Sequence, residues 1–300
     1  MDADPLYHIK QLFHRGSYKA AIDEASDQPL SPGGEAALQR AVYVARAHLA
    51  LSPPAISAAQ AVVSPFLKLN PAPPAASAAA ALASYLAGNE DAVDSVRDLV
   101  IEVEGGDVGE EWEEGMVRAL AGTIFILEKE NEEAVATLNE GKGHEDLECL
   151  AILAQLLLAL DRRDLANSTY ATAKRIGNDS TIVQAIEAWI GLKTGARPLH
   201  QAYYFYEELY QLPAGRTPGV LASHAAAHLL LGHGEEAKAD IADAAASGGG
   251  DDANVLAVAT SLGNGDAQAK LAGTSHPYAA ELKAKESAFD EAAAKFAVAA

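Results

Sequence analysis

The sequence predicts an all-α protein built as a solenoid of paired helices, with a further helical segment at its C-terminus. Two observations predict this fold. Alanine, the residue with the highest helix propensity, is abundant, and few segments alternate between apolar and polar residues as a half-buried strand does. Alanines also recur in a similar local frame at steps of 32 to 42 residues. The recurring alanines are Ala21, Ala59, Ala92, Ala134, Ala166, Ala202 and Ala237.

A step of about 34 residues is typical of the tetratricopeptide repeat, in which two antiparallel helices, A and B, form one unit. The clearest copy covers residues 150–178. Its expected helix A carries Leu153 and Leu157 on one face, and its expected helix B carries Ala166 and Tyr170. The short side chain of Ala166 allows the two helices to cross closely, and Tyr170 is expected to fill the space toward the next pair.

The other copies are less regular along the chain. Gly16 and Gly232 are expected at turns between helices A and B, because a tight or left-handed backbone there favours glycine. Pro71 is expected to mark the end of helix B in the second copy, because proline commonly follows the end of a helix. Two segments that lengthen the repeat step, 105–111 and 195–198, are expected to be loops.

The repeats predict a superhelix over residues 1–250 and a helical capping segment over residues 251–300, with a glycine-rich turn between them. One expected helix, 150–160, is apolar on nearly all sides and must be buried on more than one side. Either a partner covers its inner face, or the repeats themselves do.

The inner wall of the superhelix is the predicted partner-binding site. In the repeat frame, certain positions of helix A face neither helix B nor the neighbouring pair. These positions are Phe13, Tyr85, Ile126, Leu158 and Leu229. They are apolar where a solvent-facing residue is normally polar, which predicts that they line a groove for a protein. Tight curvature that buries them against adjacent repeats is the alternative.

Composition excludes several classes of function. The formal charge is −20, with 42 acidic and 22 basic residues, so nucleic acid and anionic membrane surfaces are poor partners. The N-terminus lacks the basic and apolar regions of a secretory signal, and no apolar run has transmembrane length. The single cysteine, Cys149, suits a reducing compartment. We therefore expect a cytoplasmic protein without direct membrane insertion.

Chemistry is not predicted: we expect no enzyme, no cofactor and no metal. His224 and His228 are four residues apart on one expected helix, and His233 and Glu235 could add metal ligands. However, Ala225 stands where the metalloprotease signature requires glutamate, and both histidines occupy core positions of the repeat. The acidic run over residues 110–114 is interpreted as a solvated helix start.

Aromatic residues are concentrated in one place. Tyr203, Tyr204, Phe205 and Tyr206 are consecutive and cover every face of a helix, so some rings must be buried and at least one must be exposed or covered by another surface. Trp189 is expected to be a packing residue.

Short stretches along the whole chain carry a family resemblance; they are 13–18, 147–149, 160–166, 188–189, 202–208, 275–277 and 284–290. Together they resemble the epsilon subunit family of the coatomer vesicle coat. The resemblance implies a non-enzymatic cytosolic subunit of the coat that returns proteins from the Golgi to the endoplasmic reticulum, peripheral on Golgi membranes and coated vesicles. It also implies that the superhelix closes around a segment of the alpha subunit's C-terminal domain, and meets other coatomer subunits through it.

Two other hypotheses compete with a coat subunit. A generic peptide-binding adaptor or co-chaperone that grips a C-terminal carboxylate requires inward-facing basic residues, whereas the inferred inward positions are mainly apolar. A helical enzyme using His224 and His228 is the third hypothesis.

Overall fold

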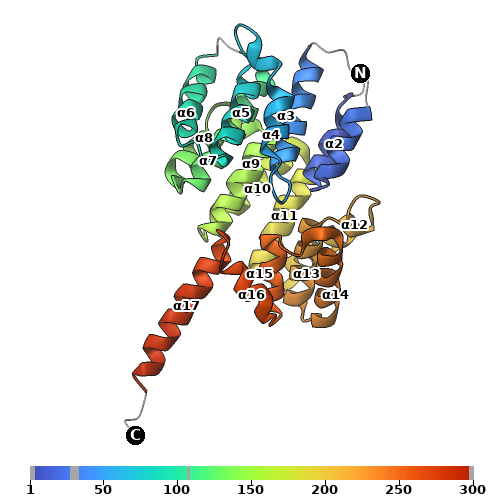
Figure 1. Ribbon diagram of the computed structural model, residues 1–300, viewed down its shortest axis with the longest axis vertical. Coiled ribbons are helices and arrows are strands. Elements are labelled where there is room, and N and C mark those ends of the chain that lie inside the picture. The colour runs from blue at the N-terminus through green and yellow to red at the C-terminus, as the bar shows by residue number, and fades with distance from the viewer. Residues whose placement is uncertain (1–3, 28–33, 107–108, 297–300) are drawn as a thin grey trace. The chain divides into compact units, whose positions relative to one another are not determined.

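The computed structural model describes residues 4–27, 34–106 and 109–296, and this part of the chain is helical with no strand (Figure 1). The all-α prediction is confirmed. The chain forms two compact units, Met1–Phe205 and Tyr206–Ala300.

The first unit is a row of helical pairs whose members contact each other. Its elements are α1 (Tyr7–His14), α2 (Tyr18–Asp27), α3 (Glu35–Leu49), α4 (Ile56–Val63), η1 (Phe66–Lys68), α5 (Pro74–Leu86), α6 (Asp91–Glu104), α7 (Glu111–Leu127), α8 (Asn131–Asn139), η2 (Gly141–Glu145), α9 (Leu147–Ala159), α10 (Arg163–Gly177) and α11 (Thr181–Thr194). The first helices of successive pairs also contact each other, α3 with α5, α5 with α7, α7 with α9 and α9 with α11. This is the stacking of a helical-repeat solenoid, as predicted.

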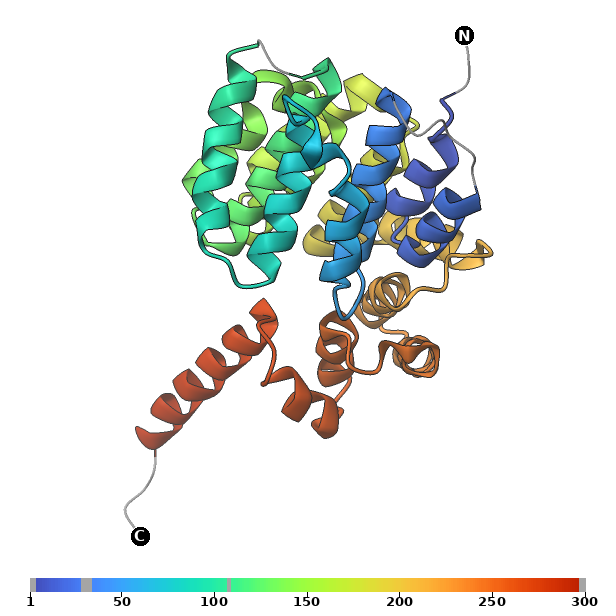
Figure 2. The ribbon, with the colours of Figure 1, turned by 45° about the horizontal axis from the view of Figure 1, so that its top comes forward.

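The second unit begins within α12 (Ala196–Gln211) and is itself built from paired helices (Figure 2). Its other elements are α13 (Pro218–Leu231), α14 (Gly234–Ala244), η3 (Ala245–Gly249), α15 (Ala253–Ser261), α16 (Gly265–Leu271) and α17 (Pro277–Ala294). Leu221 and Ala222 of α13 share a core with Ala244 and Val255. Helices beyond residue 250 therefore pack on those before it, and the compact units divide the chain differently from the predicted domains 1–250 and 251–300.

The last helix, α17, is largely exposed. Tyr278 and Ala279 in its first turn pack on the core of α15 and α16. Leu282 in its second turn is half-buried, and Glu286 accepts a hydrogen bond from Gln268 of α16. None of its residues is buried, and Phe289 is 71% exposed.

The recurring alanines occupy one structural position. All seven lie in the second helix of a pair, and each is at most 3% exposed. Ala267 in α16 has the same place in the pair and is 5% exposed, so an eighth copy exists that the sequence pattern did not reveal. At these positions only a short side chain allows the helices to approach.

The core of the first unit centres on α9. Eight of its residues are buried, because α7, α8, α10 and α11 all contact it. The predicted burial of this apolar helix on several sides is therefore confirmed, and the covering elements belong to the chain itself. Trp189 is half-buried at the edge of this core and packs against it.

Two predicted turns are present and one predicted loop is not. Gly16 and Gly232 adopt positive φ angles of 76° and 84°, a backbone that glycine allows without steric cost. The predicted loop over residues 195–198 is wrong, since only Gly195 separates α11 from α12. The predicted loop over 105–111 includes residues 107–108, which lie outside the described part, and α7 begins at Glu111.

Ala166→Leu should reduce the free energy of unfolding by about 1–3 kcal/mol, because Ala166 is fully buried and a larger side chain overpacks the helix crossing. The matched control is Ala159→Leu on the paired helix α9, at an exposed position, with an expected change within about 0.5 kcal/mol. Urea unfolding of both variants measures the difference. Equal urea midpoints for the two variants would show that the helix crossing can accommodate a leucine at position 166.

Candidate binding surface

The five predicted groove residues are all at least half-buried. Leu158 is 8% exposed and belongs to the core cluster around α9. Ile126 packs at the edge of the same cluster. Phe13, Tyr85 and Leu229 are half-buried. The structure thus places Leu158 in the chain's own core, and the binding role of the other four stays a prediction.

Phe13 lies in an aromatic and cationic cluster near the N-terminus. Its ring centroid is 5.4 Å from those of Tyr18 and Tyr43, in edge-on geometry. The guanidinium of Arg46 lies 4.6 Å from the Phe13 ring centroid, a cation–π distance. Phe13 therefore joins α1 to α2 and α3.

Tyr85, near the end of α5, donates its hydroxyl hydrogen bond to the carboxylate of Glu128, which directly follows α7. This hydrogen bond, with partial burial and the Glu128 charge, raises the pKa of Tyr85 to about 12. The side chain thus connects the ends of two neighbouring helices. Because its hydroxyl is already hydrogen-bonded, a partner could contact only its aromatic face.

Exposed leucines stand beside the predicted positions. Leu127 is 50% exposed, Leu160 is 43% exposed and Leu230 is 56% exposed, and each follows a predicted groove residue by one or two positions. An α-helix turns by about 100° per residue, so Leu127 and Leu230 lie on the face adjoining that of the predicted residue, while Leu160, two positions after Leu158, lies about 200° round the axis. Leu127 is the last residue of α7 and Leu160 directly follows the neighbouring helix α9, and we call this pair the leucine edge.

A buried charge cluster holds the first unit together. Glu148, at the start of α9, accepts hydrogen bonds from Tyr43 Oη at 2.6 Å, from His14 Nε2 at 3.1 Å and from Arg46. The side chains of Glu148 and Arg46 are 12% and 10% exposed. These contacts join α9 to α1 and α3 across more than a hundred residues of sequence.

Electrostatics in this cluster favour the ionised carboxylate. Burial alone raises the pKa of Glu148, but the charge of Arg46 and the hydrogen bonds from His14 and Arg46 outweigh it, so the pKa lies well below its ordinary value. Burial, together with the Glu148 charge, raises the pKa of Tyr43 well above its ordinary value. This cluster was not identified from the sequence. The feature of the sequence that pointed to it was Glu148, an acidic residue at the start of an otherwise apolar helix.

The acidic run at the start of α7 is partly buried, which corrects its interpretation as a solvated helix start. Glu113 is 3% exposed; it accepts hydrogen bonds from the backbone N–H of Glu110 and of Ala75, so it caps α7 and also binds the first turn of α5. Glu114 accepts a hydrogen bond from the buried guanidinium of Arg118 at 2.9 Å. The prediction of a helix start is correct. The prediction of solvation holds for Glu110, which is exposed, and fails for Glu113 and Glu114, because α5 and η2 cover them.

On α12 the aromatic run behaves as expected, with Tyr206 buried and Tyr204 60% exposed. His224 and His228 are both buried, as the core positions predicted. The proposed additional ligand Glu235 points to solvent and pairs with Lys238.

Glu148→Gln is expected to lower the free energy of unfolding by about 3–5 kcal/mol at pH 7, because it leaves Arg46 buried without its counter-charge. The folded-state pKa of Glu148 is depressed, so ionisation contributes its stability above the unfolded pKa of about 4.3, and the contribution is lost as the pH falls toward the folded pKa. The gap between wild type and variant should therefore be constant from pH 8 to pH 5 and should narrow below about pH 4.

Urea unfolding across this pH range measures the effect. Glu145→Gln, whose side chain is 60% exposed, is the matched control and should cost less than about 1 kcal/mol. If the two variants unfold at the same urea concentration, the cluster does not stabilise the first unit.

Among the helices that the structure describes, none combines the length and apolarity that a bilayer span requires.

Comparison with known proteins gives a consistent family. The model of the coatomer epsilon subunit family matches residues 2–297. Coatomer subunit epsilon-1 of Arabidopsis thaliana is 26% identical over 301 residues and covers 98% of each chain. Coatomer subunit epsilon of Caenorhabditis elegans is 25% identical, covering 97% of this chain and 98% of its own. A solved tetratricopeptide repeat protein from Parabacteroides merdae ATCC 43184 aligns over 85% of this chain and 90% of its own, at 14% identity and a TM-score of 0.48.

Proposed function

The chain belongs to the coatomer epsilon subunit family, and on this premise we propose that it binds and stabilises the C-terminal domain of the alpha subunit within the coatomer coat. The observation that carries the proposal is the family match over residues 2–297, nearly the whole chain. In this role the chain is a non-enzymatic structural subunit that supports retrograde vesicle transport from the Golgi to the endoplasmic reticulum. It is cytoplasmic, and peripheral on Golgi membranes through the coat.

The leucine edge supports an apolar contact with the partner. Leu127 and Leu160 are exposed large apolar side chains at the same ends of two neighbouring helices. Ile126 precedes Leu127 in the chain, and Tyr85 is hydrogen-bonded to Glu128, which follows it; both side chains are half-buried, and covering them with another chain removes further apolar surface from water. An apolar segment of the alpha subunit suits this lining.

A generic adaptor that grips a peptide carboxylate is the less favoured function. Such a grip requires convergent basic side chains in the groove. The candidate positions Phe13, Tyr85, Ile126 and Leu229 are all aromatic or aliphatic, and the chain carries a net charge of −20. The acidic surface instead favours the approach of a partner with basic patches.

Co-expression with the C-terminal domain of the alpha subunit, followed by size-exclusion chromatography, tests the proposed function. We expect a stable complex and a rise in the melting temperature of the chain as the partner is added, because the partner binds the folded state. Separate elution with no shift in melting temperature would overturn the proposal.

Leu127→Glu and Leu160→Glu should each weaken binding to the alpha-subunit domain at least tenfold, since a charge must then be desolvated at the contact. Both positions are exposed, so the melting temperature of the free chain should change little. Leu165→Glu, at a 40% exposed position on the second helix of the same pair, is the matched control and should bind like wild type. Equal affinities for all three variants would place the contact elsewhere.

Leu158→Glu should behave differently and unfold or strongly destabilise the free chain, because Leu158 is 8% exposed within the core. Thermal unfolding in the absence of partner measures this. A well-folded Leu158→Glu variant that has lost only partner binding would restore Leu158 to the groove.

A further inference from the structure

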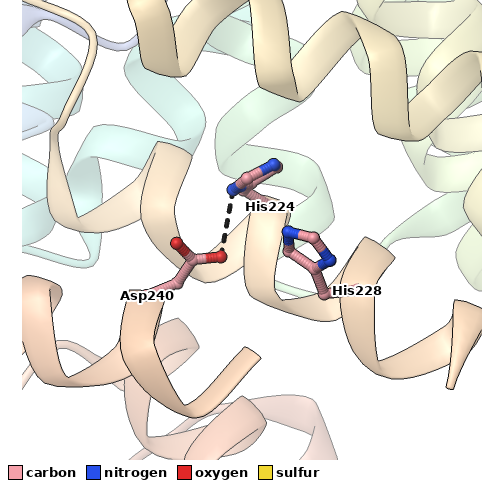
Figure 3. Close-up of side chains that lie close together, drawn as sticks. All are labelled: His224, His228 and Asp240. Atoms are coloured by element: carbon pink, nitrogen blue, oxygen red, sulfur yellow. Dashed lines mark ion pairs between the residues drawn. The ribbon is translucent and has the colours of Figure 1, made fainter. Parts of the chain in front are cut away.

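Two histidines and one aspartate meet inside the second unit (Figure 3). His224 and His228 lie one turn apart on α13, and Asp240 approaches them from α14. The three residues are 3%, 8% and 7% exposed, respectively. One ligand atom from each lies within 4.8 Å of the other two. Buried imidazoles and a buried carboxylate in one place are the donor set of a transition-metal site.

We propose that His224, His228 and Asp240 bind one Zn²⁺ ion that fastens α13 to α14. Zinc takes imidazole nitrogen and carboxylate oxygen at bond lengths of about 2.0–2.2 Å. Mg²⁺ and Ca²⁺ prefer oxygen ligands alone, so two imidazoles select against them. This site does not depend on the proposed coat function, because all of its residues belong to one chain.

The surroundings of His224 match those of a metal-bound histidine. Its Nδ1 lies 3.0 Å from Asp240 Oδ2, and its Nε2 lies 3.1 Å from Glu207 Oε2. When Nδ1 binds a metal, the Nε2–H can donate to Glu207, and such an outer carboxylate fixes the tautomer and the orientation of the ring. The ring of Tyr210 stacks on His224 at a centroid distance of 5.3 Å and covers one side of the site.

His228 has a corresponding outer partner. Its Nδ1 lies 3.3 Å from Nδ1 of His233, which is the first residue before α14. This contact directs the other ring nitrogen, Nε2, to the metal. The rings of His228 and His224 are 4.5 Å apart between centroids.

The distances require only a small closure. Donor atoms of a tetrahedral zinc site lie about 3.4 Å apart, which follows from its bond lengths. The 3.0 Å between His224 and Asp240 is already close to this value. The largest separation in the set, up to 4.8 Å, must shrink by at most about 1.4 Å, through rotation of the side chains. Three protein ligands then leave one tetrahedral position for water.

The test uses the full chain, freed of metal by a chelator and then titrated with Zn²⁺ by calorimetry and with Co²⁺ by visible absorption. We expect saturable binding of one ion per chain, the absorption of tetrahedral Co²⁺, and a melting temperature that rises with Zn²⁺ concentration. Mg²⁺ in excess should not displace the ion. A chain with no saturable Zn²⁺ binding would overturn the proposal, and the cluster would then be held only by the contacts of His224 with Asp240 and Glu207.

Variants locate the ion. Asp240→Asn and His228→Gln should each weaken Zn²⁺ binding at least tenfold, while Asp243→Asn, one turn along α14 and exposed, should bind like wild type. His228→Cys should retain binding, because a thiolate is also a zinc ligand. Circular dichroism checks that each variant is folded. If Asp240→Asn does not fold, the comparison of His228→Gln with His228→Cys decides the test. Wild-type affinity in both His228→Gln and Asp240→Asn would place the ion on other histidines and contradict the proposal.

Discussion

The close crossing of the two helices in each pair is the constraint on which the rest of the structure depends. Seven alanines, each at most 3% exposed, occupy that crossing in successive pairs, and any larger side chain there would push the helices apart. Alanine buries little apolar surface, so tightly crossed pairs gain less from the hydrophobic effect than leucine-rich ones. Buried polar groups supply additional contacts between pairs: Glu148 joins α1, α3 and α9, Glu113 joins α7 to α5, and Arg118 binds Glu104, Glu114 and the Thr137 carbonyl.

Periodicity predicted which helix each alanine belongs to, because the spacing of small residues along the chain directly reflects the pairing of helices. It could not predict the rotation of each helix about its axis with the same accuracy. The step from Ala92 to Ala134 is 42 residues while the next is 32, so a frame counted back from each alanine can err by one position. One position is enough to exchange half-buried Ile126 for exposed Leu127. An error of this kind explains why Leu158, predicted to face the groove, is a core residue; the binding role of the other four positions stays a prediction.

Polar contacts between distant segments were beyond prediction from the sequence. Nothing in the local pattern connects Glu148 with His14, 134 residues earlier, or Asp240 with the histidines of the preceding helix. His224 and His228 were recognised by their spacing as potential ligands, but the nearest carboxylate in sequence, Glu235, faces solvent. Only the packing of α14 on α13 identifies Asp240 as the third member.

The Glu148 cluster has a consequence for the growing chain on the ribosome. Arg46 precedes its carboxylate partner by 102 residues, so at a synthesis rate of about 5–20 residues per second it waits roughly 5–20 s for neutralisation. Helices before α9 contact mainly their sequence neighbours and can form early. The Arg46 guanidinium cannot be buried favourably until α9, which carries Glu148, has left the ribosome. The N-terminal helical pairs can therefore complete their packing only after the middle of the chain has been translated.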